Sequence, residues 1–294
     1  MKMLIPLVNW ILLPLSVLQV VQSNFTCPSI NIRKEIRQLA PKDLDEVFRV
    51  IEILRNNGEY DNMMDLFYKN VQERALSPSL FPWQRIFLKK LELGMQRISP
   101  NITLPYWDWS LEVKIPDRST MLRLFQKKSN PVCIGTSSER SPLVSRKSPC
   151  LDLKVQDPIR FFSPEFLVFF LGKYPTFEEF HKRLELLNAK IHMELQNMAG
   201  NRIQLRDPIN LFQAAFMDKL YATWQELHPK AVYNETNSKV ETKVTPQASQ
   251  SALVSLDSKA TNTADLCFEY SKVNHSLSKS RIKLMKDSFG SPKY

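Results

Sequence analysis

Hydrophobic side chains recur at helical spacing along three segments in the first third of the chain. Residues 42–57, 60–74 and 82–98 each carry one apolar stripe, which predicts three helices with one buried face each. Gly58 is expected to end the first helix, and Pro82 is expected at the favoured first position of the third. The stripes consist of Leu44, Val47, Phe48, Ile51 and Leu54, then Tyr60, Met64, Phe67 and Val71, then Trp83, Phe87, Leu91 and Ile98.

Two more helices are predicted in the second half of the chain. The first begins at Thr176, which forms a capping-box pattern with Glu179, and it ends before Gly200. The second follows Asp207, which we interpret as a helix cap and not as a general base, with Pro208 at its first position. Their stripes consist of Phe180, Leu184, Leu187, Ile191 and Leu195, then Phe212, Phe216, Leu220, Trp224 and Leu227.

The remaining chain has little periodicity. Residues 111–175 are expected to be mostly irregular, although the run RFFSPEFLVFFLG within them is apolar enough to be buried. The predicted fold class is therefore mainly α with little strand, in which helix pairs pack as a bundle wrapped by long loops. Bundles of this kind often hold metals or cofactors between facing helices.

The N-terminus has the composition of a secretory signal peptide. Lys2 precedes a long apolar run, and Val21-Gln22-Ser23 offers the residues that signal peptidase reads, so we expect cleavage after Ser23. The alternative is an uncleaved anchor helix, because the run approaches the length that spans a membrane. We expect a secreted protein without a transmembrane segment after cleavage, divided into a signal peptide (1–23), a folded domain (24–231) and a mostly disordered Ser/Thr/Lys-rich tail (232–294).

Secretion gives a meaning to the four cysteines. An even number in an oxidising compartment predicts two disulfides in one of three pairings, among Cys27, Cys133, Cys150 and Cys267. We expect Cys133 and Cys150 to hold a basic loop as a structural disulfide, and Cys267 to attach part of the tail to the domain. No pair has the spacing of a zinc site.

Secretion also makes the Asn-x-Ser/Thr triplets candidate glycosylation sites. Asn101, Asn234 and Asn274 are the candidates, whereas Asn24 would be the first residue of the mature chain and a poor acceptor.

The formal net charge of +10 favours acidic partners such as sulfated glycans, an anionic membrane or an acidic matrix. The basic loop at 145–155 and the tail would carry that binding. Nucleic acid is not expected as a partner, because the chain has no arginine-rich run with interleaved aromatic residues.

Two motifs resemble those of a known family. LFPWQRIFLKKLELGMQRISPNITLPYWDWS resembles the first copper-binding region of tyrosinases and molluscan-type haemocyanins, which reads F-L-P-W-H-R, a helix, and then P-Y-W-D-W. KIHMELQNMAG and RDPINLFQAAFMDKLYATWQ resemble the second region, where a histidine-rich helix precedes D-P-x-F-x-x-H-H. The likeness covers residues 35–228 in the family's order. The chain is identified as a degenerate member, which implies the central four-helix bundle of the tyrosinase-like di-copper type.

The resemblance implies a pair of copper ions, each held by three histidines, since neutral imidazoles suit copper in both oxidation states. This chain has four histidines in total. When the family's ligand positions are carried over to this sequence, only one of them holds a histidine. The six positions are Phe67, Ala75 and Gln84 for the first copper, and Asn188, His192 and Gln213 for the second.

The substituted residues predict an uncharged pocket. Gln84, Asn188 and Gln213 can hydrogen-bond to one another and to His192. Phe67 and Ala75 are expected to convert the first site partly to apolar core. No bound copper is expected. The alternative is a weak mononuclear site at His192 with Asn188, Gln213 and Met193 or Met217. His181 is expected to face solvent.

The aromatic residues of PYWDW are predicted to be scaffold. Tyr106, Trp107 and Trp109 would fill the space beneath the bundle, and Asp108 would bond a backbone N–H, an indole N–H or Arg85. The other scaffold positions that the motifs assign are Trp83, Pro208 and Trp224.

No other catalytic motif is present, since the chain lacks G-x-S-x-G, a phosphate loop, H-E-x-x-H and a glycine-rich dinucleotide turn. The predicted function is that of a secreted, glycosylated, non-catalytic tyrosinase-like protein. It would act by binding, as a matrix component or as a partner of an active relative. The first alternative is a copper-binding oxidoreductase of the phenol or catechol oxidase type with an unusual residual site. The second is a binding module for acidic extracellular polymers.

Overall fold

The computed structural model describes residues 27, 29–114, 162–198, 206–231 and 263–271. Most of them are helical, so the predicted mainly α class is confirmed. Two short strands form one parallel sheet. The helices are α1 (Pro41–Asn56), α2 (Glu59–Glu73), α3 (Leu80–Ile98), α5 (Pro164–Lys173), α6 (Phe177–Met198) and α7 (Pro208–Leu227). The strands are β1 (Asn31–Arg33) and β2 (Phe268–Tyr270), and the 3-10 helices are η1 (Ile36–Gln38), η2 (Trp109–Lys114) and η4 (Ala264–Leu266).

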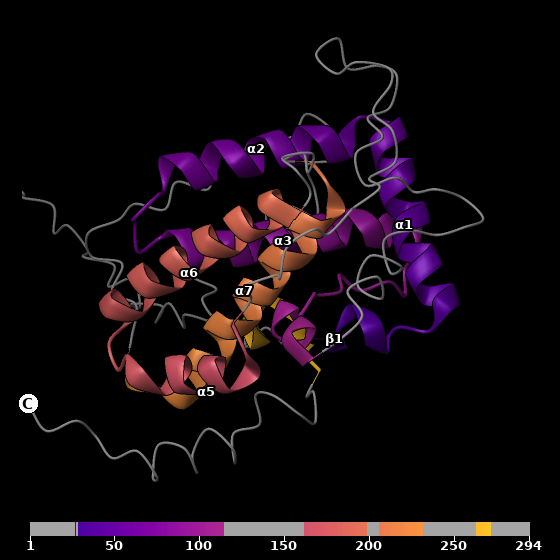
Figure 1. Cartoon of the computed structure of the whole chain (residues 1–294). Helices are drawn as coiled ribbons and strands as arrows, with labels where there is room; N and C mark the ends of the chain where they lie inside the picture. The colour runs from indigo at the N-terminus through magenta and orange to yellow at the C-terminus, as the bar shows by residue number, and fades with distance from the viewer. Residues whose placement is uncertain (1–26, 28, 115–161, 199–205, 232–262, 272–294) are drawn as a thin grey trace, which may run out of the picture.

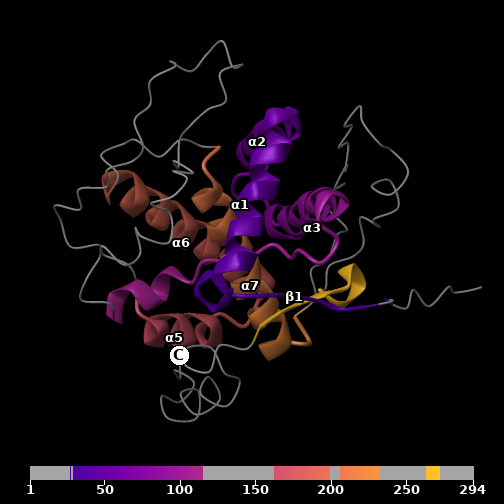
Figure 2. The ribbon, with the colours of Figure 1, turned by 90° about the vertical axis from the view of Figure 1, so that its right-hand side faces the viewer.

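Helix α7 occupies the middle of the fold (Figures 1 and 2). It contacts α3 and α5, while α1 and α2 contact each other and α3. Phe180 of α6 stacks on Trp224 of α7 with ring centroids 4.5 Å apart. Every residue of α7 from Pro208 to Tyr221 is buried, so this helix is enclosed on all sides and carries several buried polar side chains.

The three N-terminal helices begin and end close to the predicted positions. Gly58 separates α1 from α2 with a φ of +79°, a left-handed conformation that costs glycine little and other residues more. Pro82 differs from the prediction, because α3 begins at Leu80 and places it third. A proline is tolerated there, since the first backbone N–H groups of a helix have no intrahelical acceptor.

The starts of α6 and α7 were predicted correctly, but their caps differ from each other. Thr176 Oγ1 accepts from the backbone N–H of Glu179 at 3.3 Å and donates to its carboxylate at 3.1 Å. Asp207 lies at the cap position of α7 with Pro208 after it, yet its buried side chain makes no capping hydrogen bond. The predicted role of that carboxylate as a cap was therefore wrong.

Helix α5 was missed. It lies in the region expected to be irregular, although the burial predicted for its apolar run is confirmed for Leu167, Val168, Phe170 and Leu171. A run that is apolar at nearly every position shows no helical period. The signal that could have located it is the start, where Ser163 Oγ accepts from the N–H of Phe166 at 3.3 Å and Pro164 follows.

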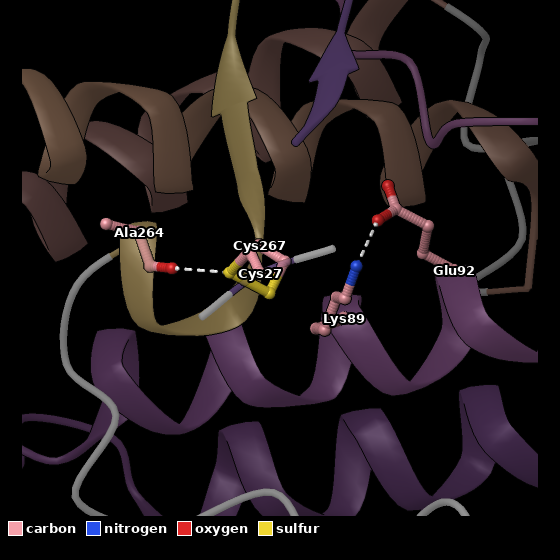
Figure 3. The surroundings of a disulfide bond; sticks show 5 residues. All are labelled: Cys27, Lys89, Glu92, Ala264 and Cys267. Carbon is pink, nitrogen blue, oxygen red and sulfur yellow. Dashed lines mark hydrogen bonds and ion pairs between the residues drawn. A yellow bond between two sulfur atoms is a disulfide. The ribbon is translucent and has the colours of Figure 1, made fainter. Parts of the chain in front are cut away.

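The C-terminal segment (residues 263–271) packs against the N-terminal strand. β2 pairs in parallel with β1, and a disulfide joins Cys27 to Cys267 across 240 residues (Figure 3). The predicted attachment of the tail through Cys267 is confirmed, and of the three pairings only one contains this bond. That pairing also joins Cys133 to Cys150, which lie outside the described residues, as do residues 1–23, Asn234 and Asn274. No described helix has the length and apolar character needed to cross a membrane.

Candidate functional site in the helix bundle

Three amide side chains meet where α3, α6 and α7 approach one another, and we call them the amide cluster. Gln213 Nε2 donates to Asn188 Oδ1 at 3.0 Å, joining α7 to α6. Gln84 Nε2 donates to the carbonyl oxygen of Ala214 at 2.9 Å, joining α3 to α7. The predicted amide network is thus confirmed between Asn188 and Gln213, while Gln84 bonds backbone instead.

The cluster leaves one buried acceptor without a partner. Gln213 is fully buried, and its Oε1 makes no hydrogen bond to any described residue. An unsatisfied buried polar atom costs about 1–3 kcal/mol of folding free energy. The cluster is therefore polar and neutral but incompletely satisfied.

His192 lies one helical turn after Asn188 on the same face of α6. Desolvation lowers the pKa of its imidazole to about 4, so the ring is uncharged at neutral pH. The predicted hydrogen bonds between His192 and the amides are not formed among the described residues, where Asn188 Oδ1 accepts from Gln213 Nε2 instead.

The position predicted for a first copper ligand on α2 is filled by aromatic packing. Phe67 is buried, with ring centroids 4.9 Å from Phe87 and 5.9 Å from Trp83. This confirms the predicted conversion to apolar core at Phe67. Ala75 does not contribute, because it is exposed in the turn between α2 and α3, and the prediction that it joins the core was wrong.

Two further predicted residues lie differently. His181 is buried and not solvent-facing: its Nδ1 lies 3.0 Å from the carbonyl oxygen of Phe177, and its ring stacks on that of Phe177. The residue is on the inner edge of the α6 stripe, which also buries Phe180 and Leu184. Met193 is 62% exposed, so it does not face the amide cluster, whereas Met217 is fully buried in α7.

The residues at these positions do not fit a copper pair. They offer one imidazole, three neutral amides, a phenyl ring and an exposed methyl group, whereas copper in both oxidation states favours imidazole or thiolate donors. Within the described ranges, no three His, Cys, Asp or Glu side chains are grouped so that they could hold a metal ion.

The aromatic residues of PYWDW pack beneath the bundle as predicted. Tyr106, Trp107 and Trp109 are fully buried. The ring centroids of Tyr106 and Trp109 lie 6.0 and 5.4 Å from the ring centroid of Phe216 in α7. Asp108 Oδ1 accepts from the N–H of Ser110 at 3.1 Å, which confirms a bond to backbone.

Arg85 pairs elsewhere, in a group of buried charges that the sequence reasoning missed. Its Nε donates to Asp218 Oδ1 at 2.6 Å, and Arg33 Nε donates to Glu92 Oε2 at 2.8 Å. Lys89 also pairs with Glu92 at 3.1 Å (Figure 3). We call these residues the ion cluster. The sequence signal for this cluster was the presence of charged residues on every side of α3. Because that helix is almost entirely buried, its charged side chains need partners.

The C-terminal segment completes the ion cluster. Tyr270 OH donates to Asp218 Oδ2 at 2.7 Å and accepts from Arg33 Nη1 at 3.1 Å, while the Arg33 guanidinium lies 3.7 Å from the centre of the Phe268 ring. Burial alone would raise the pKa of Glu92, but Arg33 and Lys89 outweigh it and the pKa is lowered. Glu92 therefore keeps its charge in the folded protein.

Comparisons with known proteins identify the scaffold that carries both clusters. The model of the common central domain of tyrosinase matches residues 57–152. Tyrosinase of Streptomyces antibioticus is 25% identical over 243 residues, which cover 69% of this chain and 86% of that protein. A functional unit of octopus haemocyanin superposes with a TM-score of 0.54 and 17% identity, over 87% of this chain and 72% of that one. Residues 57–152 thus match the common central domain of tyrosinase, and most of the chain is similar to tyrosinases and haemocyanins, the type 3 copper proteins.

Relatives in this family differ in how much of their length the chain represents. The tyrosinase-like protein tyr-3 of Caenorhabditis elegans is 33% identical over 88 residues, which cover 29% of this chain and 13% of that protein. The similarity to the octopus haemocyanin unit shows that the two chains share a helical fold, and it does not bear on activity. The resemblance stated from the two sequence motifs is confirmed.

Proposed function

We propose that this tyrosinase-family chain is a secreted protein that holds no copper pair and acts by binding, without oxidising phenols. The observation that carries the proposal is the supply of imidazole: the family's copper pair requires six histidines, and the chain contains four.

The places of these histidines strengthen the proposal. His181 in α6 and His228 directly after α7 each place Nδ1 close to the carbonyl oxygen four residues earlier, at 3.0 and 3.1 Å. His275 lies outside the described residues. His192 alone borders the amide cluster, and one neutral imidazole beside amides is a poor site for either oxidation state of copper.

A metal measurement tests the proposal. The secreted chain, expressed with added copper, is analysed for metal per protein and for oxidation of catechol, with an active tyrosinase as the positive control. We expect substoichiometric copper and no oxidation above that of free copper at the same concentration. A full copper pair in each chain, or turnover abolished by a chelator, would refute the proposal.

A copper-binding oxidoreductase with a residual site is the second candidate, favoured by the hydrogen bond between Asn188 and Gln213 and by the place of His192 one helical turn after Asn188. It predicts one copper per chain, lost in His192→Gln. The exposure of Met193 weakens it, since Met193 is one of the two thioether donors expected for such a site.

For the binding role, the excess of positive charge supports acidic extracellular polymers or an acidic matrix component as partners, and the retained fold supports an active relative as another. Retention on heparin resin should fall steeply with salt, because the interaction is between exposed charges. Retention that persists at high salt would argue against a polymer partner, and a pull-down of an active tyrosinase would then test the protein partner.

A further inference from the structure

Asn101 stands on an exposed turn directly after α3. Two hydrogen bonds hold the turn: the N–H of Ile102 donates to the carbonyl oxygen of Ser99 at 3.1 Å, and Gln96 Nε2 donates to the carbonyl oxygen of Ile102 at 2.8 Å. Ile102 is buried, whereas Asn101 before it is exposed. The side chain amide of Asn101 therefore projects from a fixed backbone into solvent.

Asn101 also begins the triplet Asn-Ile-Thr. Oligosaccharide transfer precedes folding, so a modified asparagine must end in a place where the fold leaves room for a large polar group. Asn101 meets both requirements. The other Asn-x-Ser/Thr triplets lie outside the described residues.

We propose that Asn101 carries an N-linked glycan, and that this glycan covers an apolar patch on β1. The first part rests on the proposed secretion. In the reaction, a bond forms between Asn101 Nδ2 and the anomeric carbon of a lipid-linked oligosaccharide. The bond from that carbon to the diphosphate breaks, and the amide loses a proton.

The patch lies next to the turn. Thr103 Oγ1 donates to the carbonyl oxygen of Ile32 at 3.1 Å, which fixes the turn against β1. Ile32 is 40% exposed and Ile30 is 44% exposed. They are two residues apart, so both point to the same side of the extended chain.

The distances suit coverage. Asn101 is two residues from the contact at Thr103, a separation of at most about 7 Å along an extended chain. A branched oligosaccharide extends further than that from its asparagine. A polar glycan rooted there shields the two isoleucines from contacts with other molecules.

Occupancy is tested by expressing the full chain in animal cells behind its own leader and, in parallel, behind a heterologous secretory leader. Each product is treated with peptide-N-glycosidase in heavy-oxygen water and digested. We expect the peptide with Asn101 to gain the heavy-oxygen aspartate label, and Asn101→Gln to lose the mass of one glycan. Thr103→Ser, which keeps the triplet, should keep the glycan, and Thr103→Ala should lose it.

The two leaders separate the failures. Secretion only behind the heterologous leader would refute the proposed secretion but not the glycan, provided that Asn101 is labelled. An unlabelled Asn101 in a chain that the heterologous leader has delivered would overturn the glycan.

Coverage has its own measurement. Asn101→Gln should bind more of a hydrophobic fluorescent dye than the glycosylated chain, and adding Ile30→Thr with Ile32→Thr should remove the increase. Equal dye binding by the glycosylated chain and Asn101→Gln would overturn the covering role.

Discussion

The amide cluster and the ion cluster both include residues of α3 and α7, but one is held by neutral hydrogen bonds and the other by buried ion pairs. Gln84 of the amide cluster directly precedes Arg85, and Arg85 forms an ion pair with Asp218. The two clusters are therefore close in the fold. In the ion cluster, Arg33, Arg85 and Lys89 each have a carboxylate partner, although Arg33 Nη2 makes no hydrogen bond to a described residue. In the amide cluster, Gln213 Oε1 has no partner among the described residues.

The difference distinguishes the residues that hold the fold together from the residues at the positions of the family's metal site. A buried charge without a partner costs several kcal/mol, so each member of the ion cluster constrains the others. A buried amide with one open acceptor costs less, so we expect the amide positions to tolerate substitution. This explains how the bundle can keep the architecture of its family with a different set of side chains at its centre.

The largest expected effect comes from breaking the ion cluster. Glu92→Gln leaves Arg33 and Lys89 buried with reduced compensation, and we expect a loss of about 3–5 kcal/mol in the free energy of unfolding. Urea denaturation followed by circular dichroism measures it. Glu178→Gln, at an exposed pair with Lys182, is the control and should leave the unfolding midpoint unchanged. Equal midpoints for the two variants would contradict the contrast between the clusters.

The disulfide that holds the C-terminal segment over the ion cluster comes next. Cys27→Ser with Cys267→Ser removes the link between segments 240 residues apart, which should cost about 2–4 kcal/mol. The same denaturation experiment checks it. If the segment also stabilises the cluster by its own contacts, Tyr270→Phe in the disulfide-free chain will destabilise it further, because Asp218 then loses a hydrogen bond. No further loss would show that the segment is held by the disulfide alone.

Lys219 gives a smaller, pH-dependent effect beside the ion cluster. Its Nζ lies 2.5 Å from Tyr106 OH, and desolvation, opposed by Asp108 and Glu35, lowers the pKa of Lys219 to about 8. The folded state thus binds the proton less tightly than the unfolded state does. The penalty is complete below pH 8 and is relieved as pH rises toward the ordinary lysine pKa of 10.5.

Stability should therefore rise between pH 8 and pH 10, by up to about 2 kcal/mol. Above that window, the buried tyrosines act in the opposite direction, because burial raises the pKa of Tyr106 and of Tyr60. Lys219→Met should flatten the rise in denaturation curves measured across the window. A rise of the same size in the variant would assign it to other groups.

The sequence predicted the bundle better than its interior contacts. Helical period, Gly58 and the two motifs were sufficient for α1, α2, α3, α6 and α7, because local pattern determines where an amphipathic helix begins and ends. Helix α5 lacked a period. Pairings such as Arg85 with Asp218 join residues 133 apart, and no local rule selects a partner at that distance.

The candidate site was also predicted only in part. The hydrogen bond between Asn188 and Gln213 was predicted, since the resemblance placed both at one site and amides satisfy each other. The burial of His181 and the exposure of Ala75 were not, because each depends on how a helix or turn is rotated against its neighbours.

The smallest expected effect tests the amide cluster itself. Gln213→Met keeps the side chain's length, removes the unpaired Oε1, and frees Asn188, which is partly exposed and can bond water. We expect stability to change by less than about 1 kcal/mol, in either direction, because the lost hydrogen bond and the removed unsatisfied acceptor offset each other. Gln84→Met is the matched variant, since it leaves only a backbone carbonyl without its donor. If Gln213→Met lowered the free energy of unfolding as much as Glu92→Gln does, substitution would cost as much in the amide cluster as in the ion cluster. That result would contradict the proposed difference between the two clusters.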